Sequence, residues 1–305
     1  MSTYHQPVLL RTAIQYLLEN ETDTMSKAYV DATFGGGGHS LEMLKGLKNS
    51  DQLIAFDKDD DALNNQITDE RFTLINADFK YIKKYMKMHK VQNVDAILAD
   101  IGVSSFQFDT AARGFSFRYD APLDMRMDQS QGKTAADVLL TYSEEQLKTV
   151  LEQYGEITNA AAVANDIVKT RRGKPIESIE ELKMVLEKHV YSKPEKYLAC
   201  VFQALRIEVN GELDALKQLL YDGTELLNKG GRMVIICYHS LEDRMVKQFF
   251  KNGCFDDEPA KDEFGNITQN IPMKPLLAKA ITPDAIELKS NPRSRSAKMR
   301  IGVKK

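Results

Sequence analysis

AYVDATFGGGGHS, at residues 28–40, combines a short apolar run, a carboxylate, a glycine loop and the first residues of a helix. Apolar runs of similar length recur downstream at 52–56 (QLIAF), 71–75 (RFTLI) and 94–99 (VDAILA). Between them, residues 59–67 (DDDALNNQI) and 81–90 (YIKKYMKMHK) have helical spacing. Strands that alternate with helices predict a parallel sheet with helices on its faces. The expected fold class is therefore α/β, with a Rossmann-like, doubly wound sheet.

Each predicted strand ends at or near a carboxylate. The acids are Asp31, Asp57, Asp78 and Asp100. Ligands of doubly wound sheets bind beyond the carboxyl ends of the strands, so these acids are expected to line one edge. Glycines after the first strand let the backbone approach a ligand, and Asp57 after the second strand can accept both ribose hydroxyls. The pattern predicts a site for an adenosine-containing cofactor.

The identity of that cofactor is open to a rival interpretation. NAD-dependent folds share a glycine-rich turn, and Gly35 to Gly38 could equally form no more than a tight turn. The loop lacks the Lys-Ser/Thr pair of phosphate-binding loops, and Asp31 is poorly placed beside a pyrophosphate. The same acid would stabilise a sulfonium and an ammonium group. S-adenosylmethionine is therefore favoured, and an NAD-dependent oxidoreductase is the rival.

Composition narrows the class of protein further. The 305 residues are 43% hydrophobic, enough for a large core, and their formal net charge of −3 argues against indiscriminate binding to nucleic acid. Basic clusters at 291–300 (NPRSRSAKMR) and at Lys169, Arg171, Arg172 and Lys174 are solvated surface or local RNA contacts. Residues 1–10 (MSTYHQPVLL) do not resemble a leader, and the apolar runs are shorter than a membrane span. A cytoplasmic protein without membrane contact is expected.

The cysteines and histidines give no pattern of ligands. Three cysteines lack a CxxC pair, and five histidines lack HxH or HxxxH spacing. These spacings predict neither a disulfide framework nor a metal site.

A long irregular stretch, residues 100–128 (DIGVSSFQFDTAARGFSFRYDAPLDMRMD), follows the fourth predicted strand. Long segments of this kind are usually functional. Further distinctive blocks stand at 5–10 (HQPVLL), 31–40 (DATFGGGGHS), 202–213 (FQALRIEVNGEL), 238–247 (YHSLEDRMVK) and 291–300. Together they closely resemble the RsmH (MraW) family of ribosomal RNA cytosine-N4 methyltransferases, over nearly the whole chain.

The resemblance implies a class I S-adenosylmethionine-dependent methyltransferase fold with an inserted all-helical domain. It also implies a cytoplasmic bacterial enzyme that methylates the N4 amine of a cytosine in the decoding region of 16S ribosomal RNA, within the small ribosomal subunit. The cofactor contacts that it implies are Gly37, Gly38, His39, Asp57, Phe79, Asp100 and Gln107. One block departs from the family pattern, because Tyr197 to Val201 (YLACV) stands where many members read HPATR.

The chemistry of an amine target fits these residues. The cytosine N4 lone pair is conjugated into the ring, so the amine needs a proton acceptor beside it as it attacks. Asp100, or the backbone carbonyl next to it, is expected to be that acceptor, and Asp100 is the predicted catalytic residue. Methylation at C5 would need a cysteine nucleophile, and the sequence from 100 to 128 contains none.

Substrate contacts have two interpretations at most positions. An extruded base is commonly held by aromatic faces, but aromatics in a loop also form small cores. The candidates are Phe106, Phe108, Phe115, Phe117 and Tyr119. Arg113, Arg118 and Arg126 either contact phosphates or pair with nearby acids. Gln203, Arg206 and Asn210 share one helix face, which either meets RNA or forms a structural hydrogen-bond network.

The domain plan follows from where the alternating pattern stops. Residues 1–106 and 197–305 are expected to form the cofactor-binding domain, and 107–196 an inserted helical domain for substrate recognition. Capping boxes at Ser143 with Gln146 and at Ser178 with Glu181 predict helix starts in the insertion.

The sheet is expected to resume at 232–238 after a helix at 211–231, and the last strands to come from 281–288 (ITPDAIEL) and 297–304 (AKMRIGVK). Residues 256–275 are expected to be a mobile excursion.

A second rival function is a ribosome-assembly factor that binds RNA without methyl transfer. The sequence neither requires nor excludes a homodimer.

Overall fold

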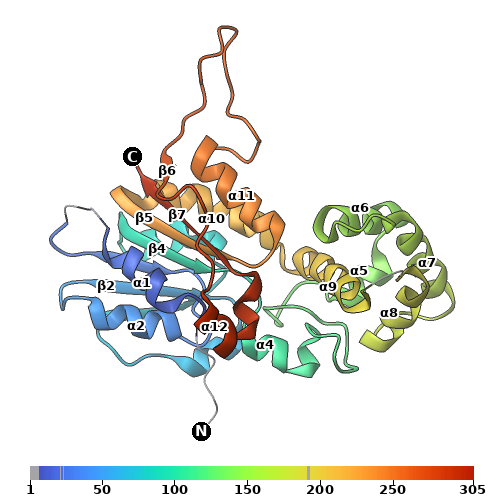
Figure 1. The fold of residues 1–305 in the computed structure, drawn as a ribbon. Helices are drawn as coiled ribbons and strands as arrows, with labels where there is room; N and C mark the ends of the chain where they lie inside the picture. The colour runs from blue at the N-terminus through green and yellow to red at the C-terminus, as the bar shows by residue number, and fades with distance from the viewer. Residues whose placement is uncertain (1–6, 21, 23, 191–192) are drawn as a thin grey trace. The chain divides into compact units, whose positions relative to one another are not determined.

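The computed structural model describes residues 7–20, 22, 24–190 and 193–305. The motif residues His5 and Gln6 lie outside them. The described chain divides into two compact units, one of residues 1–102 with 214–305 and one of residues 103–213. The first unit is built on a seven-stranded sheet of order β3-β2-β1-β4-β5-β7-β6 (Figure 1).

The sheet confirms the doubly wound arrangement. Its strands are β1 (Ala28–Asp31), β2 (Gln52–Asp57), β3 (Phe72–Asn76), β4 (Val94–Asp100), β5 (Leu227–Cys237), β6 (Met273–Pro275) and β7 (Lys298–Lys304). The first five pair in parallel, whereas β7 runs antiparallel to both β5 and β6. All four residues of β1 are buried, as expected for a central strand covered on both faces.

Two apolar clusters cover the faces of this sheet. On one face, side chains of the sheet pack with Ile82 and Met86 of α3 and with apolar residues of α10 and α11. On the other face they pack with α1 and α2. The helices of the first unit are α1 (Leu10–Leu18), α2 (Gly38–Gly46), α3 (Ile82–Met88), α10 (Glu212–Leu226, which begins at the end of the second unit), α11 (Ser240–Asn252) and α12 (Ala285–Ser290), with the 3-10 helices η1 (Asp60–Asn65), η2 (Phe79–Tyr81) and η5 (Pro292–Ser296).

Two local predictions were wrong. The segment 281–288 is not a strand, because the Asp284 side chain accepts a hydrogen bond from the Glu287 N–H and starts helix α12. The missing strand is β6, which lies inside the expected excursion at 256–275. Residues 59–67 form only the short η1, where the Asp59 side chain caps the Asp61 N–H.

The second unit is helical in its described part. Its elements are α4 (Ser105–Asp109), η3 (Ala111–Arg113), α5 (Ala135–Thr141), α6 (Glu144–Gly155), α7 (Ala160–Gly173), α8 (Ile179–Leu186), η4 (Glu187–His189) and α9 (Pro194–Asn210). Both predicted capping boxes are present, at the starts of α6 and α8. The unit extends from Val103 to Leu213 rather than from 107 to 196, because α9 buries Phe202 and Leu205 in its apolar cluster.

Several ambiguous side chains of the second unit have structural partners. Phe117 packs edge-on against Phe202 with ring centroids 5.4 Å apart, and Phe115 is buried in the same cluster. The buried Arg113 donates to the carbonyl oxygens of Arg126 and Met127.

The polar face of α9 is also satisfied by protein groups. Asn210 accepts from the Met127 N–H and donates to the Met125 carbonyl, and Gln203 donates to the Tyr154 carbonyl. Arg206 forms a bidentate pair with Glu212. These bonds fit the structural interpretation of this face, whereas Phe106 and Tyr119 remain exposed.

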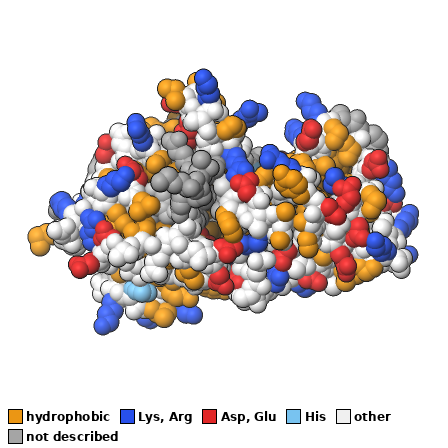
Figure 2. All heavy atoms as spheres, turned by 90° about the horizontal axis from the view of Figure 1, so that it is seen from below, with side chains coloured by type: hydrophobic (Ala, Val, Ile, Leu, Met, Phe, Trp, Pro, Cys, Tyr) orange, Lys and Arg blue, Asp and Glu red, His pale blue; other side chains and the backbone are white. Residues whose placement is uncertain are grey.

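The surface carries mixed charge. Figure 2 shows Lys and Arg side chains interspersed with Asp and Glu over the visible face. No helix among the described residues is both long enough and apolar enough to span a membrane.

Candidate functional site

Three carboxylates meet at the carboxyl edge of the sheet in the first unit. Strand β1 lies between β2 and β4, and Asp31 is in register with Ala55 of β2 and Leu98 of β4. Asp57 and Asp100 end those two neighbouring strands. The expectation that these acids share one edge is therefore confirmed. The elements that carry them are fixed by long-range pairing, so the cluster is preorganised.

The glycine loop between β1 and α2 requires its glycines. Gly35 has φ +52° and donates its N–H to Asp57 Oδ2 at 2.7 Å. Gly37 has φ +75°, and a Cβ there would lie 2.9 Å from the Phe34 ring. A Cβ on Gly38 would lie 2.2 Å from Pro7 Cγ. Side chains are thus excluded where the loop turns into the helix, and the backbone beside Asp57 is left accessible.

Asp31 is the most buried of the three carboxylates. Its Oδ2 accepts from Ser40 Oγ at 2.6 Å, and its Oδ1 accepts from the Thr33 N–H at 3.1 Å. Burial raises the pKa of Asp31, although His39 and the hydrogen bond from Ser40 oppose the rise. This acid orients the loop and adds negative charge below it.

Asp100 is held from three sides. Tyr238, directly after β5, donates its hydroxyl to Asp100 Oδ1 at 2.7 Å. The Asp100 N–H donates to Thr33 Oγ1 at 2.7 Å, and Asp100 Oδ2 lies 3.9 Å from His39 Nδ1. Burial raises the pKa of Asp100 to about 6, and the charge of Asp31 adds to the rise, whereas His39 and Tyr238 lower it.

His39 connects the loop to the N-terminal segment. Its Nε2 lies 3.1 Å from the carbonyl oxygen of Val8, and since a carbonyl can only accept, Nε2 is the donor. The other ring nitrogen therefore faces Asp100.

Asp57 is the second acid with a strongly raised pKa. Burial raises the pKa of Asp57 to about 6, with smaller contributions from the charges of Asp59 and Asp31, against hydrogen bonds from the Asp59 and Gly35 N–H groups. The charge of Asp31 raises the pKa of both Asp57 and Asp100, so the three acids form a site that favours a cation. An adenosine with a positively charged sulfur and an ammonium group fits this cluster of carboxylates. A pyrophosphate does not, because it is itself negatively charged.

The other predicted residues have different surroundings. Phe79 begins η2 just after β3 and packs on the core below that strand. Asp78 does not join the acid cluster electrostatically, since Lys58 Nζ and Lys80 Nζ lie 3.4 and 3.8 Å from it. Gln107 belongs to the second unit, where it forms a capping box with Ser104. A cofactor contact for Gln107 stays a prediction.

No sequence motif predicted a role for Tyr238. Its position directly after a buried strand was a usable signal, because that position also falls at the carboxyl edge. Its partner, Asp100, is 138 residues away, so only the tertiary structure reveals the bond.

Comparisons with known proteins agree over the full length. The family model described as the MraW methylase family matches residues 2–305. A protein of Flavobacterium johnsoniae is 49% identical over 302 residues, which cover 99% of this chain and 98% of the relative. One of Cytophaga hutchinsonii is 51% identical over 301 residues, covering 98% of each chain. Both carry the name ribosomal RNA small subunit methyltransferase H.

A solved structure also aligns along the whole chain. It is described as a putative rRNA-methylase from Clostridium thermocellum, with 14% identity, 100% coverage of both chains and a TM-score of 0.43.

Proposed function

The chain belongs to the MraW methylase family, and we propose that it methylates the N4 amine of a cytosine in the decoding region of 16S ribosomal RNA, with S-adenosylmethionine as methyl donor. Its fold is the class I, Rossmann-like methyltransferase fold with an inserted helical unit. The observation that carries the proposal is the anionic edge formed by Asp31, Asp57 and Asp100. The names of the relatives support a ribosomal substrate, and a ribosomal substrate supports a cytoplasmic location.

Different predicted residues would contact different parts of the cofactor. Asp57 would accept the ribose hydroxyls of the bound cofactor, and Phe79 would contact its adenine. Gly37, Gly38 and His39 would line the methionine end, and a contact from Gln107 stays a prediction. When bound, S-adenosylmethionine supplies a methyl group made electrophilic by its sulfonium charge. The absence of a metal in this chemistry stays a prediction.

Asp100 accepts the proton that the target amine loses. Its Oδ1 is fixed by Tyr238, so its other oxygen can accept an N–H from the amine and thereby direct the nitrogen lone pair toward the methyl group. A carboxyl with a pKa of about 6 can take up the proton, which favours Asp100 over the neighbouring carbonyl. Holding nitrogen and methyl in line contributes roughly 7–11 kcal/mol in well-oriented systems.

The cysteines of the chain favour nitrogen over carbon as the target. Cys237 ends β5 near this edge, but it is 1% exposed and burial raises the pKa of its thiol well above the ordinary value. A buried neutral thiol is a poor nucleophile for the ring attack that C5 methylation needs.

Nucleoside analysis tests the proposal. We expect that small subunits from cells lacking the enzyme gain N4-methylcytidine when treated with the purified protein and S-adenosylmethionine, as measured by mass spectrometry of digested 16S RNA. Methyl groups on C5 or on another base would contradict the N4 assignment. Binding to subunits without any methyl transfer would instead favour the assembly-factor interpretation, and calorimetric binding of NADH but not S-adenosylhomocysteine would favour the oxidoreductase.

Tyr238→Phe tests the support of Asp100. The hydrogen bond from Tyr238 lowers the pKa of Asp100, so its loss should raise that pKa above about 6. The acidic limb of the kcat profile should then move to higher pH by about 0.5–1 unit, because an ionised acceptor is needed, with kcat down about 2–5-fold at pH 6, by no more than about 2-fold at pH 7, and the KM for cofactor nearly unchanged.

The matched control for this substitution is Tyr221→Phe. Tyr221 lies on α10 with its ring edge-on to Phe249 at 5.3 Å. It should leave the pH profile in place. A Tyr238→Phe profile that keeps the wild-type limb would show that the hydroxyl has no influence on the proton acceptor.

A further inference from the structure

A basic segment precedes the last strand and has no part in the chemistry described above. Residues 285–300 contain five Lys or Arg and one acid, Glu287, on a chain whose net charge is −3. We call residues 285–300, which span α12, η5 and the start of β7, the basic rim segment. Its charge is therefore a local departure from the rest of the protein.

Sheet register brings this segment to the carboxyl edge. Strand β7 runs antiparallel to β5, and Lys298 at its start pairs with Cys237 at the end of β5. The next residue of that chain is Tyr238, whose hydroxyl binds Asp100. The residues just before Lys298 consequently lie at the same edge as the anionic cluster.

A hydrogen bond also holds α12 at this edge. Glu287 Oε1 accepts from the Leu9 N–H at 2.7 Å. The preceding residue, Val8, has its carbonyl oxygen 3.1 Å from His39 Nε2. Glu287, the only acid of the segment, is thus hydrogen-bonded to the N-terminal segment that contacts His39. The exposed charge of the basic rim segment is therefore positive.

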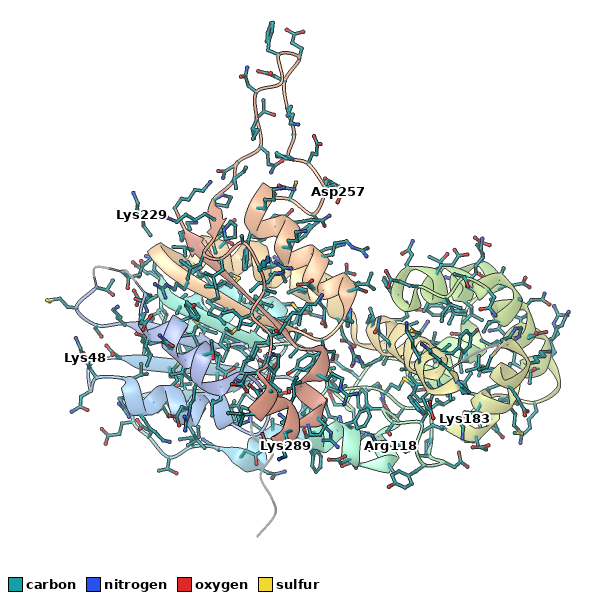
Figure 3. The ribbon with its side chains drawn as sticks, in the orientation of Figure 1. Lys48, Arg118, Lys183, Lys229, Asp257 and Lys289 are labelled. Carbon is teal, nitrogen blue, oxygen red and sulfur yellow. The ribbon has the colours of Figure 1, made fainter. Side chains whose placement is uncertain are left out.

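Burial within the segment follows the three-residue period of a 3-10 helix. Asn291, Ser294 and Ala297 are 4%, 0% and 1% exposed. This anchoring turns Arg293 and Arg295 to the exposed side. Lys289 is also exposed, and Figure 3 shows it on α12.

The second basic cluster of the sequence belongs to the second unit. Arg171 donates to the carbonyl oxygens of Leu139 and Tyr142, and Lys174 pairs with Glu181 at 2.5 Å. Half of that cluster therefore has a structural role. In the basic rim segment, Lys298 and Arg300 pair with Asp243, and the side chains of Lys289 and Arg295 are exposed.

From this placement we propose that the basic rim segment binds the phosphate backbone of the RNA next to the target nucleotide, through Lys289, Arg293 and Arg295. The inference rests on the proposed function. Contacts of this kind position a nucleic acid without reading its sequence, and they make binding depend on salt. The segment flanks the site where the amine must meet Asp100, so it sets how the strand enters.

The test compares Lys289→Gln/Arg295→Gln with Lys48→Gln/Lys229→Gln. The control lysines are also exposed, but they follow α2 and begin β5, at the opposite edge of the sheet (Figure 3). Filter binding to protein-free 16S RNA and to small subunits is measured from low to high salt. We expect the rim variant to bind both about 10-fold more weakly and its log–log salt slope to become shallower by about 1–2. The control and wild type should coincide.

Each other outcome overturns the surface assignment. Rim and control variants that bind alike would show that the segment does not contact RNA. Weaker binding to small subunits with unchanged binding to protein-free RNA would identify a ribosomal protein as the partner instead. Calorimetric affinity for S-adenosylhomocysteine should stay unchanged in the rim variant. Binding is measured without turnover, so absence of methyl transfer by the wild type would refute the proposed function separately.

Discussion

Asp100→Asn is expected to reduce methyl transfer by about 10²–10⁴-fold, the usual contribution of a positioned acid–base group, while it makes the free protein more stable at pH 8. The amide retains an oxygen that can accept the Tyr238 hydroxyl, so the geometry at the end of β4 is kept. It lacks the charge and the proton affinity that the amine requires. Activity and stability should therefore move in opposite directions.

The stability gain follows from the pKa of Asp100. Burial raises it from 3.8 to about 6 in the folded protein. The folded state thus binds more protons than the unfolded state between these values, and the stability of the wild type falls as the pH rises through that window. A neutral amide avoids this loss, which corresponds to about 1–3 kcal/mol above pH 6.

Thermal unfolding of the free protein at pH 5 and pH 8 measures this effect. Asp100→Asn should unfold at a higher temperature than the wild type at pH 8 and gain much less at pH 5. Asp214→Asn, at a carboxylate that is 85% exposed, is the matched control and should leave the unfolding temperature unchanged at both pH values. If Asp100→Asn instead unfolded at a lower temperature than the wild type at pH 8, the claim that the ionised carboxylate destabilises the folded protein would be refuted.

The sequence predicted the edge of the sheet well because strand ends are a local property. Asp31, Asp57 and Asp100 each follow an apolar run, and parallel strands bring such positions together. Local patterns failed where two structures compete for the same residues. Residues 281–288 alternate like a strand, yet the Asp284 cap selects a helix.

Other features depend on contacts that no local pattern contains. The need for glycine at position 38 comes from Pro7, and the support of Asp100 comes from Tyr238. The resemblance to a family supplied roles for single residues, but not these neighbours. The outward charge of the basic rim segment likewise emerges only when the burial of Asn291, Ser294 and Ala297 is known.

Asp57→Asn is expected to weaken cofactor binding by about 10²–10³-fold. Two ribose hydroxyls would lose charge-assisted hydrogen bonds, each about 1.5–3 kcal/mol, partly offset by bonds to the remaining amide oxygen. The carboxylate also accepts from the Gly35 N–H at 2.7 Å and from the Asp59 N–H at 2.9 Å. An amide can accept only one of these bonds, so the glycine loop loses its alignment as well.

Calorimetry with S-adenosylmethionine and S-adenosylhomocysteine measures this loss. Both ligands contain the same ribose, so their affinities should fall by similar factors. Asp78→Asn is the control at the neighbouring strand end, where Lys58 and Lys80 neutralise the carboxylate, and it should weaken binding far less. A loss that affects S-adenosylmethionine but spares S-adenosylhomocysteine would mean that Asp57 acts on the sulfonium charge, and the ribose assignment would have to be abandoned.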